Sequence, residues 1–234
     1  MKRFYKLVTI EETQGGYQIC LDGRAVKTKS GAVLIAPNQA TADQVMCEWA
    51  GQGEEIIPDT MPFTQILNTM IDRVMVEREA MNLYVLKYLN TDLICYPAPE
   101  PESLAQLQEK LWSSYLRWFE DKFGVALKTT TGLVALSQDD AAHEKVAEFV
   151  GNLDHMRFTL LQLVTSVSGS LVLAMALLEK HVSAKEAFEA CFIEEHYKDV
   201  LYDAEKYGQD PMTAKKQAAA LRDLEAVERY LSFI

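Results

Sequence analysis

The chain has 234 residues, of which 49% are hydrophobic, and its 34 acidic and 23 basic residues give a formal net charge of -11. This length and composition can bury a substantial core and argue against a disordered protein. The acidic balance disfavours general nucleic-acid binding, because a negative surface repels phosphate backbones. The four cysteines form no CxxC pair and no zinc pattern, so we interpret them as reduced thiols.

The first forty residues predict β-structure. Residues 4–10 are rich in strand formers, a glycine turn follows at 14–16, and residues 17–21 alternate in the manner of a strand. Asp22-Gly23 is a strong signal for a two-residue hairpin turn, because both positions of such a turn need positive φ. Return strands over 24–28 and 33–36 would complete a small antiparallel sheet or partial barrel.

Beyond Pro37 the hydrophobic period becomes that of helices, beginning with a helix that carries Ala42, Val45 and Trp49 on one face. Everything after Pro62 is predicted to be helical, apart from a proline-rich break at 96–101 and an ambiguous segment at 125–134. We expect helices over residues 102–123, 139–150, 153–180, 184–207 and 211–233.

Strands followed by helices predict an α+β fold rather than a doubly wound sheet. We expect a small β-rich domain with one helix over residues 1–60 and a larger all-helical domain over residues 61–234. Residues 158–178 carry no charge over about the length of one membrane span. Their threonine, glutamine and serine side chains would need partners in lipid, so we interpret this stretch as a buried helix and expect no stable membrane insertion.

Enzyme and metal motifs are mostly absent from the sequence. Gly51-Gln52-Gly53 follows a helix rather than a strand, which is the wrong context for a dinucleotide turn, and no GxxxxGK[ST] loop is present. Asp140 and His143 share a helix face, but a metal needs three or four convergent ligands. The sequence therefore predicts no catalytic motif and no metal site.

Two groups of polar residues are candidates for structural or interdomain roles. Asn68 and Asp72 share a helix face, with Arg73 adjacent. Either they form a polar site near Trp49, or they form a buried hydrogen-bond network that holds the two domains together, which we favour. Asp92 either caps a turn locally or pairs with a nearby arginine.

The last third of the chain contains an acidic segment with three possible roles. It is a solvated helix face, a partner-binding patch, or a catalytic pair, although acid–base catalysis normally requires a lined pocket. The carboxylates concerned are Glu189, Glu194, Glu195, Asp199, Asp203 and Glu205.

Five strings, in order along the chain, resemble those of one family. Residues 22–28 (DGRAVKT) resemble a DGRxVKTP hairpin, 48–52 (EWAGQ) an EWxxQ helix end, 67–74 (LNTMIDRV) a LANTAIDRV stretch, 91–96 (TDLICY) a TDLLCYR segment, and 165–176 (TSVSGSLVLAMA) a TxSGSLVLALA helix. The family is that of the ATP synthase assembly chaperones that handle the alpha subunit of the catalytic sector in mitochondria and alphaproteobacteria. Lys29 stands where the family has proline, and Tyr207-Gly208 where it has Trp-Gly.

The resemblance implies a non-enzymatic molecular chaperone, without a cofactor, that binds the free alpha subunit of the F-type ATP synthase and prevents its aggregation until it assembles with beta. An isolated alpha subunit exposes surface meant for its neighbours, and such surface aggregates. The family's functionally important acidic residue falls on Glu194 or Glu195, and Asp199 lies about one turn further on. We therefore expect these three residues to bind the partner.

Two alternative functions remain open from the sequence. A small-molecule enzyme or metal protein would use the acidic C-terminal helix, with Glu194, Glu195 and His196 around a cavity. A generic interaction scaffold would bind a different protein. The sequence shows no signal-peptide or transit segment, so we expect a cytoplasmic bacterial protein, with the mitochondrial matrix as the alternative.

Overall fold

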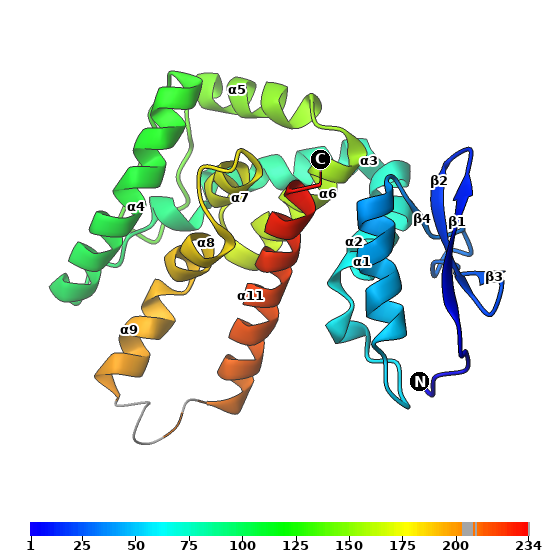
Figure 1. Ribbon diagram of the computed structural model, residues 1–234. Helices are drawn as coiled ribbons and strands as arrows, with labels where there is room; N and C mark the ends of the chain where they lie inside the picture. The colour runs from blue at the N-terminus through cyan, green and yellow to red at the C-terminus, as the bar shows by residue number, and fades with distance from the viewer. Residues whose placement is uncertain (203–207, 209, 234) are drawn as a thin grey trace. The chain divides into compact units, whose positions relative to one another are not determined.

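The computed structural model describes residues 1–202, 208 and 210–233 (Figure 1). The chain forms two compact units, one of residues 1–78 with 229–234 and one of residues 79–228. This division differs from the boundary expected at residue 60. The helical residues just after 60 lie with the first unit, where Phe63, the one aromatic residue among them, stacks on Tyr230 with ring centroids 6.0 Å apart.

Within residues 1–78, all of which are described, four strands form an antiparallel sheet. β1 (Val8–Thr13) pairs with β2 (Gly16–Leu21), and both β3 (Arg24–Ala25) and β4 (Ile35–Ala36) pair with β2. The turn into β3 has positive φ at both Asp22 (48°) and Gly23 (77°), which confirms the predicted two-residue hairpin. The first strand begins at Val8 rather than at residue 4, and β3 is shorter than predicted.

The core of the first unit lies between the sheet and α1 (Gln39–Ala50). Ile19, Leu34, Ala42 and Val45 are completely buried. Burial of their aliphatic surface is the main stabilising contribution of this layer, at roughly 25 cal/mol per Å² of apolar surface removed from water. The remaining elements are η1 (Pro58–Thr60), α2 (Pro62–Thr69), the π-helical turn η2 (Met70–Val74) and the start of α3 (Met75–Leu86).

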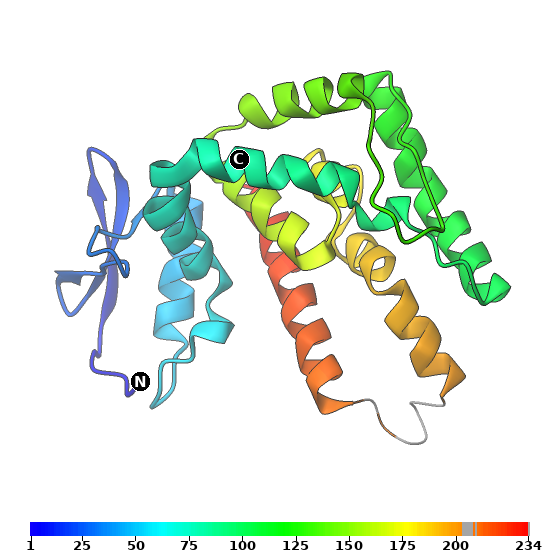
Figure 2. The same cartoon turned by 180° about the vertical axis from the view of Figure 1, so that it is seen from behind.

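The second unit is helical and is built around α7 (Leu171–Leu178), in which every residue is buried. Figures 1 and 2 show the neighbouring helices around it, and α4, α6 and α8 all contact α7. Because α7 is apolar on all sides, it needs cover on every face. The other elements of this unit are η3 (Lys87–Asn90), η4 (Leu93–Cys95), α4 (Glu102–Phe123), α5 (Asp140–Gly151), α6 (His155–Ser168), α8 (Ala184–Cys191), α9 (Ile193–Leu201) and α11 (Pro211–Leu231), whose last residues belong to the first unit.

The single helix predicted over residues 153–180 is wrong. Gly169 adopts a left-handed conformation (φ 70°) and ends α6, and the side chain of Ser170 then accepts a hydrogen bond from Leu173 N and begins α7. The helix predicted over 184–207 is also interrupted, at Phe192 (φ -109°, ψ 17°), and its predicted end at Tyr207 lies outside the described residues.

The α+β fold class is confirmed, with the strands in the N-terminal part of the described chain and helices in the rest. The uncharged stretch at 158–178 corresponds to α6 and the buried α7. Among the residues that the structure describes, none of the helices has both the length and the apolar character that crossing a membrane requires.

Candidate partner-binding site on helix α9

The predicted partner-binding residues all lie on α9. Helix α8 begins with a capping box between Ser183 and Glu186 and stops at Cys191, so the chain enters α9 through the non-helical Phe192. Glu194 and Glu195 occupy the first turn of α9, where carboxylates interact favourably with the helix dipole. Of the other predicted carboxylates, Asp203 and Glu205 lie outside the described residues.

Helix α9 is attached to α4 by polar contacts. None of the residues Ile193–Leu201 is buried. Gln108 on α4 is fully buried, and its Nε2 donates to Glu194 Oε1 over 3.1 Å while its Oε1 accepts from Ala98 N over 2.7 Å. One turn further along α9, the Tyr197 hydroxyl lies 2.6 Å from Ser103 Oγ. The Glu194 carboxylate is therefore already used inside the protein.

Glu195 and Asp199 lie on another face of the same helix. At about 100° per residue, the two residues project roughly 150° away from the face that carries Glu194 and Tyr197. Both are half-buried. Burial, with a smaller contribution from the nearby Glu195 carboxylate, raises the pKa of the Cys191 thiol to about 12, so this cysteine stays protonated and unreactive.

The described end of α9 is apolar and exposed. Val200 is 81% exposed, Leu201 60% and Tyr202 71%. Large side chains of this kind, next to one another and next to carboxylates, are typical of protein-binding surfaces. The helix therefore combines a polar attachment to α4, a carboxylate face and an apolar end.

The candidates for structural or interdomain roles in the first unit fall into two separate clusters. Asp72 in η2 accepts hydrogen bonds from Ser30 N (3.1 Å) and Ser30 Oγ (2.6 Å). Burial opposes ionisation, but these bonds and those from neighbouring groups outweigh it and lower the Asp72 pKa. Trp49 instead contacts the N-terminal segment, where its carbonyl accepts from Tyr5 Oη over 2.7 Å.

Asn68 is half-buried on α2 and Arg73 is exposed in η2. The Ser30–Asp72 bonds connect residues on either side of the boundary expected at residue 60, and the roles of Asn68 and Arg73 stay predictions. The bonds of Asp72 join a loop of the sheet to the π-helical turn within the first unit.

Asp92 is fully buried in the second unit and has the hydrogen bonds of a helix cap. Its Oδ1 accepts from Ile94 N at the start of η4 (3.3 Å), and its Oδ2 accepts from Val172 N in the first turn of α7 (2.9 Å). Desolvation, partly offset by these and neighbouring hydrogen bonds, raises the Asp92 pKa to about 6. Asp92 therefore stabilises the starts of η4 and α7, but ionising its buried carboxyl group costs folding free energy, and this cost depends on pH.

Sequence reasoning missed the role of Glu48. Its carboxylate accepts from Phe63 N (2.7 Å), Thr64 N (2.8 Å) and Thr64 Oγ1 (2.7 Å), so it caps the N-terminus of α2. Gln52, four residues later, accepts from Ile57 N over 2.7 Å and holds the loop before α2. The spacing of Glu48 and Gln52 was visible in the sequence, but their partners are separated from them by a loop.

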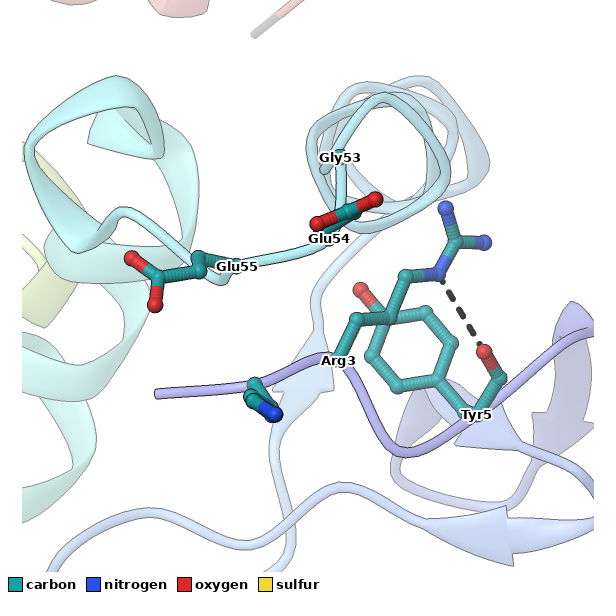
Figure 3. Close-up of a pocket in the computed structure, with 6 residues that line it drawn as sticks. Arg3, Tyr5, Gly53, Glu54 and Glu55 are labelled. Carbon is teal, nitrogen blue, oxygen red and sulfur yellow. Dashed lines mark hydrogen bonds between the residues drawn. The ribbon is translucent and has the colours of Figure 1, made fainter.

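One hollow of about 480 Å³ lies beside the N-terminal segment, as Figure 3 shows, and is lined by Arg3, Tyr5, Glu54 and their neighbours. The Arg3 guanidinium donates to Ala50 O at the end of α1 over 3.4 Å and to Gln52 O in the following loop over 2.6 Å. Within the described part of the chain, no group of three histidine, cysteine or acidic side chains is placed to hold a metal ion.

Helix α9, with its carboxylates and its exposed apolar end, has the chemistry of a surface that could bind another protein. A family model described as ATP12 chaperone protein matches residues 2–120, and the chain belongs to this family. This is the family of ATP synthase assembly chaperones that the five sequence strings resemble, so the resemblance is confirmed.

Relatives match over nearly the full length of the chain. The mitochondrial protein atp12 of Schizosaccharomyces pombe is 24% identical over 241 residues, covering 94% of this chain and 81% of its own. The crystal structure of Atp12 from Paracoccus denitrificans is 28% identical with a TM-score of 0.85, covering 99% of this chain and 97% of its own. The Atu1473 protein of Agrobacterium tumefaciens is 31% identical with a TM-score of 0.88, covering 99% and 85%.

Proposed function

We propose that this protein is a non-enzymatic chaperone that binds the free alpha subunit of the F-type ATP synthase and keeps it from aggregating until it assembles with beta. Membership of the ATP12 chaperone family supports the class of function. The observation that carries the site is helix α9, which has no buried residue and combines carboxylates with an exposed apolar end. The protein would act in the compartment where new ATP synthase subunits are made or imported, the bacterial cytoplasm or the mitochondrial matrix.

The chemistry of α9 suits a contact that must later be released. Apolar contact through Val200, Leu201 and Tyr202 supplies affinity, whereas carboxylates steer and orient the partner. The affinity should be moderate, because beta must displace the chaperone. We assign partner contact to Glu195 and Asp199, and we assign to Glu194 the positioning of α9 on α4 through Gln108.

The first test is binding to the isolated alpha subunit. The purified protein should form a complex with that subunit in size-exclusion chromatography, suppress its light scattering on warming, and release it when beta is added. Failure to bind alpha, together with capture of an unrelated protein, would favour a generic scaffold and refute the proposal.

The second test concerns the carboxylate face. The double variant Glu195→Lys/Asp199→Lys should bind alpha at least roughly 10-fold more weakly, because the new lysines would repel the cationic groups that the two carboxylates are proposed to contact. Asp140→Lys/Glu144→Lys on α5 makes the same change in net charge at two exposed positions and serves as the matched control. Equal affinities of the two double variants, with unchanged helical circular dichroism, would refute the site assignment.

A further inference from the structure

The loop that connects α4 to α5, the green tube in Figure 2, exposes two large apolar side chains at its tip. Leu133 is 104% exposed and Val134 is 83% exposed. Exposed apolar residues scattered singly are ordinary on protein surfaces, but two consecutive ones at a loop tip form a small protruding patch. This patch lies outside α9 and is not used by the site described above.

The base of this loop is fixed by hydrogen bonds. The side chain of Gln138, which is 3% exposed, accepts from Lys128 N over 2.9 Å and donates to Lys128 O over 3.0 Å. Lys128 Nζ also pairs with the Asp139 carboxylate. These contacts join the two arms of the loop at its base, where Lys128 and Gln138 are ten residues apart in the chain.

Both arms of the loop are hydrogen-bonded to residues at the end of η4, Cys95 and Tyr96. Thr130 N donates to Cys95 O over 2.9 Å, and Leu136 N donates to the Tyr96 hydroxyl over 2.7 Å. These two hydrogen bonds fix both ends of the five-residue tip, residues 131–135. A pre-organised loop loses little conformational entropy on binding, which favours its use as a contact.

The part of the loop beyond the Lys128–Asp139 ion pair is uncharged. Residues 129–138 contain no acidic or basic side chain, in a chain in which 24% of the residues are charged. The occupant of such a tip must offer apolar surface. A second copy of this chain, with its net charge of -11, and an anionic bilayer are both disfavoured by like-charge repulsion. An unassembled subunit exposes the apolar surface that its neighbours would cover.

We propose that Leu133 and Val134 form a second contact of this chaperone and insert into an apolar depression on the free alpha subunit. The inference rests on the proposed function for the identity of the client. A tip of five residues can bury far less surface than the roughly 1,200 Å² that a stable interface needs. The loop would therefore add affinity to the α9 contact rather than replace it. Its contribution is apolar, while that of Glu195 and Asp199 is electrostatic.

The variant Leu133→Ser/Val134→Ser tests the proposal by titration with the isolated alpha subunit. We expect on the order of 10- to 100-fold weaker binding, the scale of removing two aliphatic side chains from a buried contact. Leu83→Ser/Leu107→Ser, which changes two other exposed leucines, is the matched control and should stay within about twofold of the unmodified protein.

The outcomes separate this inference from the proposed function. If the unmodified protein does not bind alpha, the proposed function fails and the inference fails with it. If the unmodified protein binds and the tip variant binds equally well, the proposed function stands and the inference is overturned.

A fluorescent label identifies the occupant directly. Val134→Cys is made in a Cys47→Ser background, because Cys47 is the exposed native thiol, and is labelled with an environment-sensitive dye. A blue shift on adding isolated alpha supports the proposal. A shift on adding excess unlabelled chaperone, or vesicles of phosphatidylserine and phosphatidylcholine, in the absence of alpha would overturn it in favour of self-association or membrane contact.

Discussion

The buried carboxylate of Asp92 should make the stability of the helical unit depend on pH in an unusual direction. Asp92 is 0% exposed and caps both η4 and α7, and desolvation raises its pKa from 3.8 to about 6. A carboxyl group with a raised folded-state pKa binds its proton more tightly in the folded protein than in the unfolded chain. Its stabilising contribution is therefore complete below pH 3.8 and is lost as the pH rises through 6.

The size of the effect follows from the two pKa values. Each unit of difference corresponds to about 1.4 kcal/mol, so a change from 3.8 to about 6 costs about 3 kcal/mol once Asp92 is fully ionised. Most of this cost, about 2 kcal/mol, develops between pH 4 and pH 7. The hydrogen bonds from Ile94 N and Val172 N remain, so the ionised side chain is tolerated rather than expelled.

Urea unfolding of the wild type and of Asp92→Asn, followed by circular dichroism from pH 4 to pH 7, measures this effect. Asparagine does not titrate, so the wild type should lose about 2 kcal/mol relative to the variant as the pH rises. Asp22→Asn is the control with the opposite sign, because hydrogen bonds from Leu7 N and Lys6 N lower the Asp22 pKa. A stability difference between the wild type and Asp92→Asn that is independent of pH would refute the reasoning.

Two further predictions concern the capping and attachment residues. Glu48→Ala should lower the free energy of unfolding by about 2 kcal/mol, because it removes the cap of α2 and leaves part-buried N–H groups without an acceptor. Urea unfolding measures this change. The control is Glu54→Ala, which removes a carboxylate at an exposed position. Gln108→Leu should increase hydrogen exchange in α9 and leave α7 protected, because it removes the contact to Glu194, and equal exchange in α9 of both proteins would contradict the polar attachment.

Much of the fold could be predicted because it depends on local chemistry. The Asp22-Gly23 turn was predictable since positive φ at two adjacent positions restricts the residue types that fit. The helix over Glu102–Phe123 was predictable in both bounds. The break at Gly169 was not, because an isolated glycine in an apolar stretch is tolerated inside a helix, and here the tertiary cap from Asp92 on α7 accompanies the break.

Several of the five strings that resemble the family contain residues that connect separate elements of the fold. Glu48 caps α2, Asp72 holds Ser30, and Asp92 caps η4 and α7, while Gly169 and Ser170 form the turn between α6 and α7. The side chains of Glu48, Asp72 and Asp92 each accept a hydrogen bond from a group distant in the chain. Periodicity does not reveal such partners, which is why sequence reasoning offered only alternatives for Asp72 and Asp92 and no role for Glu48.

The face of α9 that is proposed to bind a partner is harder to predict from the sequence than these connections are. Helix α9 is amphipathic, with Ile193, Tyr197, Val200 and Leu201 at helical spacing, but none of its residues is buried. Periodicity alone therefore does not tell a binding face from a solvated one. Only the structure separates Glu194, which hydrogen-bonds to the buried Gln108, from Glu195 on another face. Because the fold is held by the capping side chains of Glu48 and Asp92 and by the buried α7, substitutions of Glu195 and Asp199 should have little effect on folding. We therefore expect folding and binding to be separable: substitutions of Asp92 and Glu48 should change stability, and substitutions of the proposed contact residues Glu195 and Asp199 should change partner binding.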